Sequence, residues 1–133
     1  MQYPEKQPME VNEFIRISVT TSYVQQRSDP KGRCFEFSYS IKIYNDGNEG
    51  VRLLRRHWHI RDEIGKIQEV TGDGVVGQKP VILPKQIFEY TSAAIISTET
   101  GTMHGNYEME YLSGRKFNAP IGSFLLSIPH VTH

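Results

Sequence analysis

Apolar and polar residues alternate with a period of two along most of this chain. The clearest run, at 34–45, reads "CFEFSYSIKIYN" and has five apolar residues on one parity, facing polar residues on the other. Because successive side chains of a β-strand point to opposite faces, this run predicts a strand with one buried and one solvated face. An earlier run at 14–24, "FIRISVTTSYV", repeats the pattern with Ile15, Ile17 and Val19 on one face.

Similar runs continue to the end of the chain, at 51–62, 66–70, 87–93, 103–112 and 123–128. In the run at 51–62, Leu54, Trp58 and Ile60 share one parity with Arg56 as the exception, and a bulge or a sheet edge is expected near Arg55–Arg56. Glycine, proline and asparagine separate the runs, and "SGRKFNAPIG" at 113–122 is interpreted as a turn. The pattern predicts an all-β fold, a fibronectin type III-like (immunoglobulin-like) β-sandwich of about seven antiparallel strands.

The domain organisation follows from length and local composition. The 133 residues suit one domain, which we place at 13–133. Residues 1–12 are polar, contain two prolines, and are predicted to be a mobile leader.

Charge and cysteine content narrow the class of protein. Fifteen basic and fifteen acidic residues cancel, so we expect no nucleic-acid partner and no attraction to an acidic membrane. The single cysteine, Cys34, excludes an intrachain disulfide. With no long apolar run and no signal-peptide pattern, the chain is expected to be cytoplasmic and not bound to a membrane.

One segment resembles a nucleotide-binding motif. Gly72, Gly74 and Gly77 form a G-x-G-x-x-G pattern, which in a dinucleotide-binding fold requires a helix directly after the glycines. Pro80 and Pro84 and several β-branched residues follow instead, so a helix is not expected. Two interpretations stay open: a loop whose glycines serve the fold, or a loop whose backbone N–H groups bind an anion.

The run "RRHWHIR" holds a second candidate site. On a strand, Arg55, His57, His59 and Arg61 share one face and Trp58 takes the other. This face is interpreted as solvated surface, with an anion or an acidic partner as the functional alternative. His57 and His59 could also bind a metal ion, with His104 as a third ligand if its strand is adjacent.

Several motifs in order give the chain a family resemblance. They are an R-x-W-x-I strand, V-x-G-x-G-V-V-G-x-x-P, Y-T-S, G-x-M-x-G-x-Y-x-M and F-x-L-x-x-P, which correspond to Arg56–Ile60, Val70–Pro80, Tyr90–Ser92, Gly101–Met109 and Phe124–Pro129. Across residues 13 to 130 the chain resembles the ApaG family of bacterial proteins. It departs from the family pattern at Lys85 and Ala93, where glycine is usual, and in its "HVTH" ending.

The resemblance implies a fibronectin type III-like sandwich and a link to cobalt resistance and magnesium efflux in bacteria. In eukaryotic multidomain proteins the same module looks like a protein-interaction domain, and no enzymatic activity is agreed for the family.

The residues themselves favour a protein that is not an enzyme. Cys34 has no nearby histidine, and Ser92 lacks the G-x-S-x-G context of a nucleophile elbow. No cofactor is expected. The leading hypothesis is a module that binds an unknown protein partner, with a possible homodimer through edge strands. The alternative is a sensor of phosphate, pyrophosphate or a divalent metal that uses the glycine loop and the Arg/His face.

Overall fold

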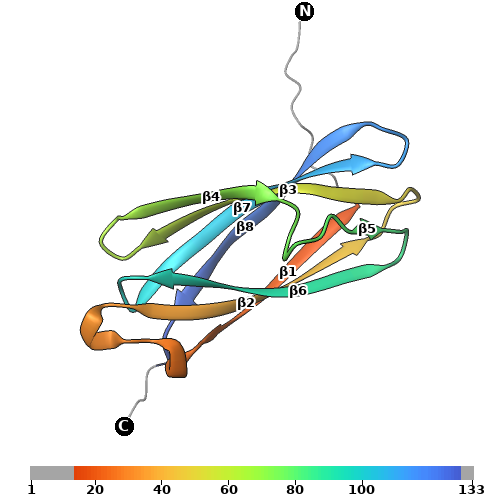
Figure 1. The fold of residues 1–133 in the computed structure, drawn as a ribbon. Coiled ribbons are helices and arrows are strands. Elements are labelled where there is room, and N and C mark those ends of the chain that lie inside the picture. The colour runs from red at the N-terminus through yellow and green to blue at the C-terminus, as the bar shows by residue number, and fades with distance from the viewer. Residues whose placement is uncertain (1–13, 130–133) are drawn as a thin grey trace, which may run out of the picture.

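Two antiparallel sheets packed face to face make up the fold in the computed structural model, which describes residues 14–129 (Figure 1). The three-stranded sheet has the order β1–β2–β6, made of β1 (Ile15–Tyr23), β2 (Phe35–Asn45) and β6 (Ile87–Ile96). The five-stranded sheet has the order β4–β3–β7–β8, with β5 also paired to β3. Its strands are β3 (Val51–Asp62), β4 (Ile67–Asp73), β5 (Val81–Ile82), β7 (Thr100–Tyr111) and β8 (Lys116–Ser127).

The all-β prediction is confirmed, and the two packed sheets agree with a fibronectin type III-like sandwich. Two short 3₁₀ turns, η1 (Gln25–Arg27) and η2 (Pro30–Gly32), occupy the connection between β1 and β2. The predicted leader at 1–12 lies outside the described residues.

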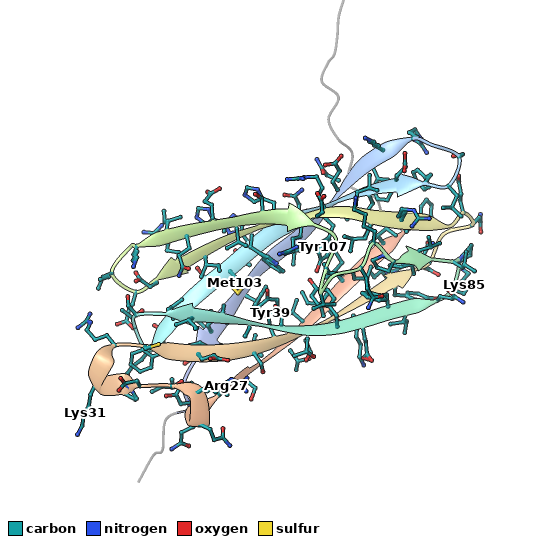
Figure 2. All side chains as sticks on the ribbon, in the orientation of Figure 1. Arg27, Lys31, Tyr39, Lys85, Met103 and Tyr107 are labelled. Atoms are coloured by element: carbon teal, nitrogen blue, oxygen red, sulfur yellow. The ribbon has the colours of Figure 1, made fainter. Side chains whose placement is uncertain are left out.

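The core lies between the inner faces of the sheets, where alternation along each strand places its apolar residues. Phe37, Ile41 and Ile43 of β2 are completely buried, as the sequence pattern predicted. Figure 2 shows Tyr39, Met103 and Tyr107 between the two sheets. Trp58 of β3, only 1% exposed, packs edge-on against Tyr39, and its burial confirms the predicted inward parity of β3 at this point.

Few direct hydrogen bonds join the two sheets at their lateral sides. On one side the Gln68 side-chain amide donates to the Ile95 carbonyl and links β4 to β6. On the other side the Thr21 hydroxyl donates to the Leu125 carbonyl and links β1 to β8. The sheets are therefore held together chiefly by their shared apolar core.

The β3 bulge occurs earlier than the sequence pattern indicated. The register with β7 shifts between Leu53 and Arg55, so Leu53 is completely buried while Leu54 is only half-buried. The expectation that Leu54 faces the core was therefore wrong. After the bulge, Arg56 has the inward parity of Trp58. Its half-buried side chain donates hydrogen bonds to the backbone carbonyls of Asp73 and Gly74.

The interpretation of residues 113–122 as a turn was also wrong. β8 begins at Lys116, and Phe117, Ala119 and Ile121 alternate into the core. Pro120 is accommodated because β8 is the last strand of its sheet, where one side of the backbone has no strand to bond.

No helix in the described part of the chain is long and apolar enough to cross a membrane.

Candidate functional site

The outer face of the five-stranded sheet holds the predicted Arg/His row. Arg55 and Arg61 are exposed, and His57 and His59 are partly exposed, on the face opposite to Trp58. The structure therefore brings these four side chains to one surface, as the parity of the strand predicted.

Acidic residues of the neighbouring strand balance this row. β4 pairs with β3 so that Asp73 stands opposite Arg55 and Glu69 opposite His59. The guanidinium of Arg55 lies 2.7 Å from Asp73 Oδ1. Glu69 reaches both histidines, with Oε1 3.2 Å from His57 Nε2 and Oε2 3.1 Å from His59 Nδ1. An anion arriving at this face would have to compete with two carboxylates already in place.

A third histidine lies next to this group on the other side of β3. β7 pairs with β3 in a register that sets His104 directly opposite His59, and their ring centroids are 4.6 Å apart at an interplanar angle of 30°. The condition under which His104 could join His57 and His59 is therefore met. In the described part of the chain, however, no three His, Cys, Asp or Glu side chains are already arranged to hold a metal ion.

A polar hollow of about 200 Å³ adjoins the histidines on the same face. Its walls include Arg55, His57, Thr71 and two asparagines, and the Asn106 amide nitrogen donates to Asn118 Oδ1 at 3.2 Å. Donors and acceptors are mixed here, so the hollow suits a small polar group without favouring one sign of charge.

The glycine segment begins at the edge of this surface, since Gly72 pairs with Arg56 across β3 and β4. The Arg56 guanidinium donates to the carbonyls of Asp73 (3.2 Å) and Gly74 (3.0 Å). A Cβ at position 72 would stand 2.9 Å from that guanidinium. The glycine loop and the Arg/His face are thus neighbours, as the sensor hypothesis requires, but Arg56 binds the carbonyl side of the loop.

Backbone hydrogen bonds occupy much of the remaining loop. The Gly74 N–H donates to the Leu54 carbonyl, and Val75 and Gln78 exchange two hydrogen bonds of 2.8 Å each. Between them, Val76 and Gly77 have φ values of 41° and 79°, the positive values typical of a type I′ hairpin turn. Gly74 has φ 61°, and a Cβ there would lie 2.0 Å from the Gln78 carbonyl oxygen. The geometry of the turn therefore accounts for Gly74 and Gly77 without a bound ligand.

A second hollow lies at the end of the sandwich where β1 and β3 begin. It measures about 200 Å³ and has mostly apolar walls, to which Ile15, Val51 and Tyr111 contribute. Arg115 stands at its side with its guanidinium carbon 4.6 Å from the centre of the Tyr111 ring. This hollow was not predicted, because its residues come from three segments that are far apart in the sequence, at 14–15, 45–51 and 111–115.

Two exposed apolar side chains meet near Gly50, next in sequence to the hollow residues Glu49 and Val51. Leu112 is 54% exposed and Leu83 44% exposed, and both approach Gly50 closely enough that a Cβ there would touch them. We call the hollow, Arg115, Leu83 and Leu112 the cavity end. The walls also include Glu49, whose carboxylate accepts a hydrogen bond from the Ser113 N–H. An apolar hollow with one cation and one carboxylate beside it can hold an apolar side chain next to a polar or charged group.

The core contains a cluster of buried hydroxyl groups. Tyr90 and Tyr107 share a hydrogen bond between the sheets. Burial raises the pKa of both phenols far above its usual value, so both stay protonated at neutral pH. Burial also raises the pKa of Tyr39, although a hydrogen bond with Ser92 opposes the rise. The Ser92 hydroxyl is thus engaged with a tyrosine.

Comparison with known proteins places these features in a family. The family model described as the ApaG domain matches residues 25–111. A protein named Protein ApaG from Azoarcus sp. (strain BH72) is 44% identical over 119 residues, which are 90% of this chain and 94% of that one. The Protein ApaG of Xylella fastidiosa (strain M12) is 41% identical over the same shares of both chains.

Solved structures give the same result. A crystal structure described as the putative ApaA protein from Bordetella pertussis matches with a TM-score of 0.86 and 40% identity, covering 93% of this chain and all of that one. An X-ray structure of a structural genomics target matches with a TM-score of 0.85 and 43% identity, covering 90% and 91%.

Proposed function

Because the chain belongs to the ApaG family, we propose that it is a non-enzymatic β-sandwich module that works by binding a protein partner through its cavity end. The observation that carries this proposal is an apolar hollow at the end of the sandwich, with the exposed side chains of Leu83 and Leu112 meeting near the adjacent Gly50. Exposed apolar surface next to a well-formed hollow is typical of protein-binding sites. The partner segment supplies an apolar side chain for the hollow.

Charged residues beside the hollow can orient the partner, and Arg115 is one of them. Its guanidinium is placed over the Tyr111 ring, which fixes its position beside the hollow. Glu49 also borders the hollow, so a polar or charged group of the partner can pair with either side chain, and this pairing would set the orientation of the partner segment.

A site-specific crosslinking experiment tests this proposal. A photoreactive phenylalanine replaces Leu112 in one variant and Leu125 in a control, and each is irradiated in extract of the source cell. The two leucines are nearly equally exposed, at 54% and 58%, but Leu125 lies on β8 at the opposite end of the sandwich. We expect a defined adduct from position 112 and not from position 125.

Binding of the captured partner is then measured with substituted proteins. Leu112→Glu and Arg115→Glu should weaken it at least about tenfold, as expected for central interface residues, while Leu125→Glu leaves it unchanged. The same adducts from both positions, or none, would show that the cavity end is not the binding surface.

Self-association through edge strands remains part of the proposal. β4 pairs only with β3, and Val70 on it is partly exposed, so a second copy could add its own strand there. Sedimentation of the purified protein over a range of concentrations would measure this directly. If both the wild type and Val70→Lys sediment as monomers at every concentration, the homodimer hypothesis is wrong.

The anion-sensor alternative has less support than partner binding. Asp73 and Glu69 already pair with Arg55 and the histidines, and three N–H groups of the glycine loop have backbone acceptors. Saturable heat in a calorimetric titration with pyrophosphate would support this alternative. The link to cobalt resistance and magnesium efflux implied by the family remains a prediction.

A further inference from the structure

β6 is the last strand of the three-stranded sheet, and in the described part of the chain no strand pairs with its outer side. We propose that two copies of this protein associate by pairing β6 with β6 of the second copy, antiparallel and centred on Thr91. The two three-stranded sheets then form one continuous sheet. This edge is separate from β4 and shares no residue with the cavity end, so the inference does not depend on partner binding there.

Hydrogen bonds of the backbone show which groups of β6 point outward. The Asn45 N–H at the end of β2 donates to the Gln86 carbonyl, so odd-numbered residues of β2 bond to even-numbered residues on the β6 side. Because these groups alternate along an antiparallel strand, the odd-numbered residues of β6 direct their N–H and C=O groups away from β2. The Ile95 carbonyl agrees with this direction, since it accepts from the Gln68 side-chain amide of β4 at 3.0 Å.

The side chains at these outward positions are complementary to themselves about Thr91. A two-fold axis at Thr91 sets Ile87 of one copy opposite Ile95 of the other, and Glu89 opposite Ala93. Ile87 is 59% exposed and Ile95 49% exposed, and the pairing brings these apolar side chains together twice. No like charges stand opposite each other, and two threonines meet at the axis, which is a favourable pair across strands. A second copy therefore fits this edge better than an arbitrary strand.

Features that hinder strand addition are weaker on β6 than on the other edges. β8 contains Pro120, which has no N–H to offer a further strand, and β4 has only seven residues. β6 has ten residues, contains neither proline nor glycine, and pairs with β2 without a bulge. The Ile95 carbonyl is already bonded to Gln68, but a carbonyl oxygen can accept a second hydrogen bond.

Disulfide trapping with oxidised glutathione tests the pairing and its register, in a Cys34→Ser background that removes the single native thiol. Opposite residues of a hydrogen-bonded pair have Cα atoms about 5.5 Å apart, within the range of about 4.4–6.8 Å that a disulfide spans. Thr91→Cys should therefore form a disulfide-linked dimer. Glu89→Cys and Ala93→Cys should not, because each lies about 14 Å from its own copy. Thr20→Cys, exposed on the same face but on β1, is the matched control.

Sedimentation equilibrium of further variants measures the strength of the pairing. Thr91→Pro removes an N–H that points away from β2 and should abolish the dimer, whereas Thr91→Ala should retain it. Ala93→Glu sets a carboxylate opposite Glu89 of the second copy and should weaken association about fivefold. Ala93→Lys should strengthen it by a similar factor, an effect that a loss of fold stability would not produce. Thermal melts verify that each variant is folded.

Two results would overturn the proposal. One is a wild type that sediments as a monomer up to about 1 mM, and the other is a Thr91→Cys variant that crosslinks no faster than Thr20→Cys. A dimer that dissociates in Val70→Lys but persists in Thr91→Pro would also overturn it, because the contact would then lie on β4. None of these results affects crosslinking at the cavity end, so failure of this inference and failure of the proposed function are distinguishable.

Discussion

Trp58 is surrounded by aromatic rings at the centre of the sandwich. Tyr39, Tyr107 and Phe124 all meet its ring at steep angles, with centroids 5.4 to 6.4 Å away. The indole Nε1 is buried and has no hydrogen-bond partner among the described residues. Its contribution to stability therefore comes from apolar contact and from the edge-to-face ring contacts rather than from its polar atom.

Removing this side chain should leave a large hole between the sheets. Trp58→Ala is expected to lower the free energy of unfolding by about 3–5 kcal/mol, measured by urea denaturation. Thr71→Ala, on the exposed outer face of the same sheet opposite His57, serves as the control and should cost less than about 1 kcal/mol. A loss below about 1 kcal/mol for Trp58→Ala would contradict the central position of this residue.

At the residue scale, parity assigned most side chains to the correct face. Alternation on a strand is a local property, so the positions of His57, His59 and Trp58 could be predicted from the sequence alone. The neighbour Glu69 could not be predicted in this way, and His104 only on the condition that its strand is adjacent, because both lie beside the histidines through strand register. Register depends on the turns and on the packing of whole sheets, which local alternation does not specify.

At the scale of elements, the strands at 35–45 and 51–62 matched the pattern closely because each buries one complete apolar face. The two errors arose where local signals compete with tertiary context. An extra residue at Leu54 reverses the parity of the residues before it, and the glycine and proline of 113–122 conceal an edge strand. A bulge and a sheet edge become visible only when the neighbouring strand is known.

The turn after β4 supports a prediction about one element. Gly74→Ala should cost at least about 2 kcal/mol, because alanine is strained at positive φ and its Cβ would meet the Gln78 carbonyl oxygen. Gly122→Ala is the matched control, since nothing lies within 4 Å of a Cβ at that position and its φ is not positive. Chemical denaturation of the two variants side by side measures the difference. If both lost the same stability, the tight turn would not be the cause.

At the scale of the whole molecule, two carboxylates near opposite ends couple the fold to pH. Lys85 and then Arg16 lower the pKa of Asp46 through hydrogen bonds. Burial raises the pKa of Asp62, but hydrogen bonds from Ser97 and from the Lys66 and Ile64 N–H groups outweigh it and lower the pKa below 3.8. For both groups the stabilisation is present above the pKa of the unfolded chain and is lost as pH falls through the folded value.

When one of these carboxyls is removed, the stability of the fold should therefore depend less on pH below neutrality. We expect the melting temperature of the wild type to fall as pH drops below about 4. The Asp62→Asn variant should have a lower melting temperature than wild type at neutral pH, and its melting temperature should fall less steeply in acid. Glu89→Gln, on an exposed ion pair, is the control for a general change of net charge. Parallel profiles for wild type and Asp62→Asn would contradict the role given to Asp62.

The direction of the chain through the sandwich has a practical consequence. Phe14 stands beside the hollow, whereas β8 ends at Ser127, next to the start of β7 and at the far end (Figure 1). Strands of this length separate the two ends by about 40 Å. A linker or sensor-chip anchor attached after residue 129 leaves the hollow open to solution, while one attached before residue 14 crowds it. In a head-to-tail fusion of two such modules, the upstream copy would keep its hollow free and the downstream copy would have it beside the joint.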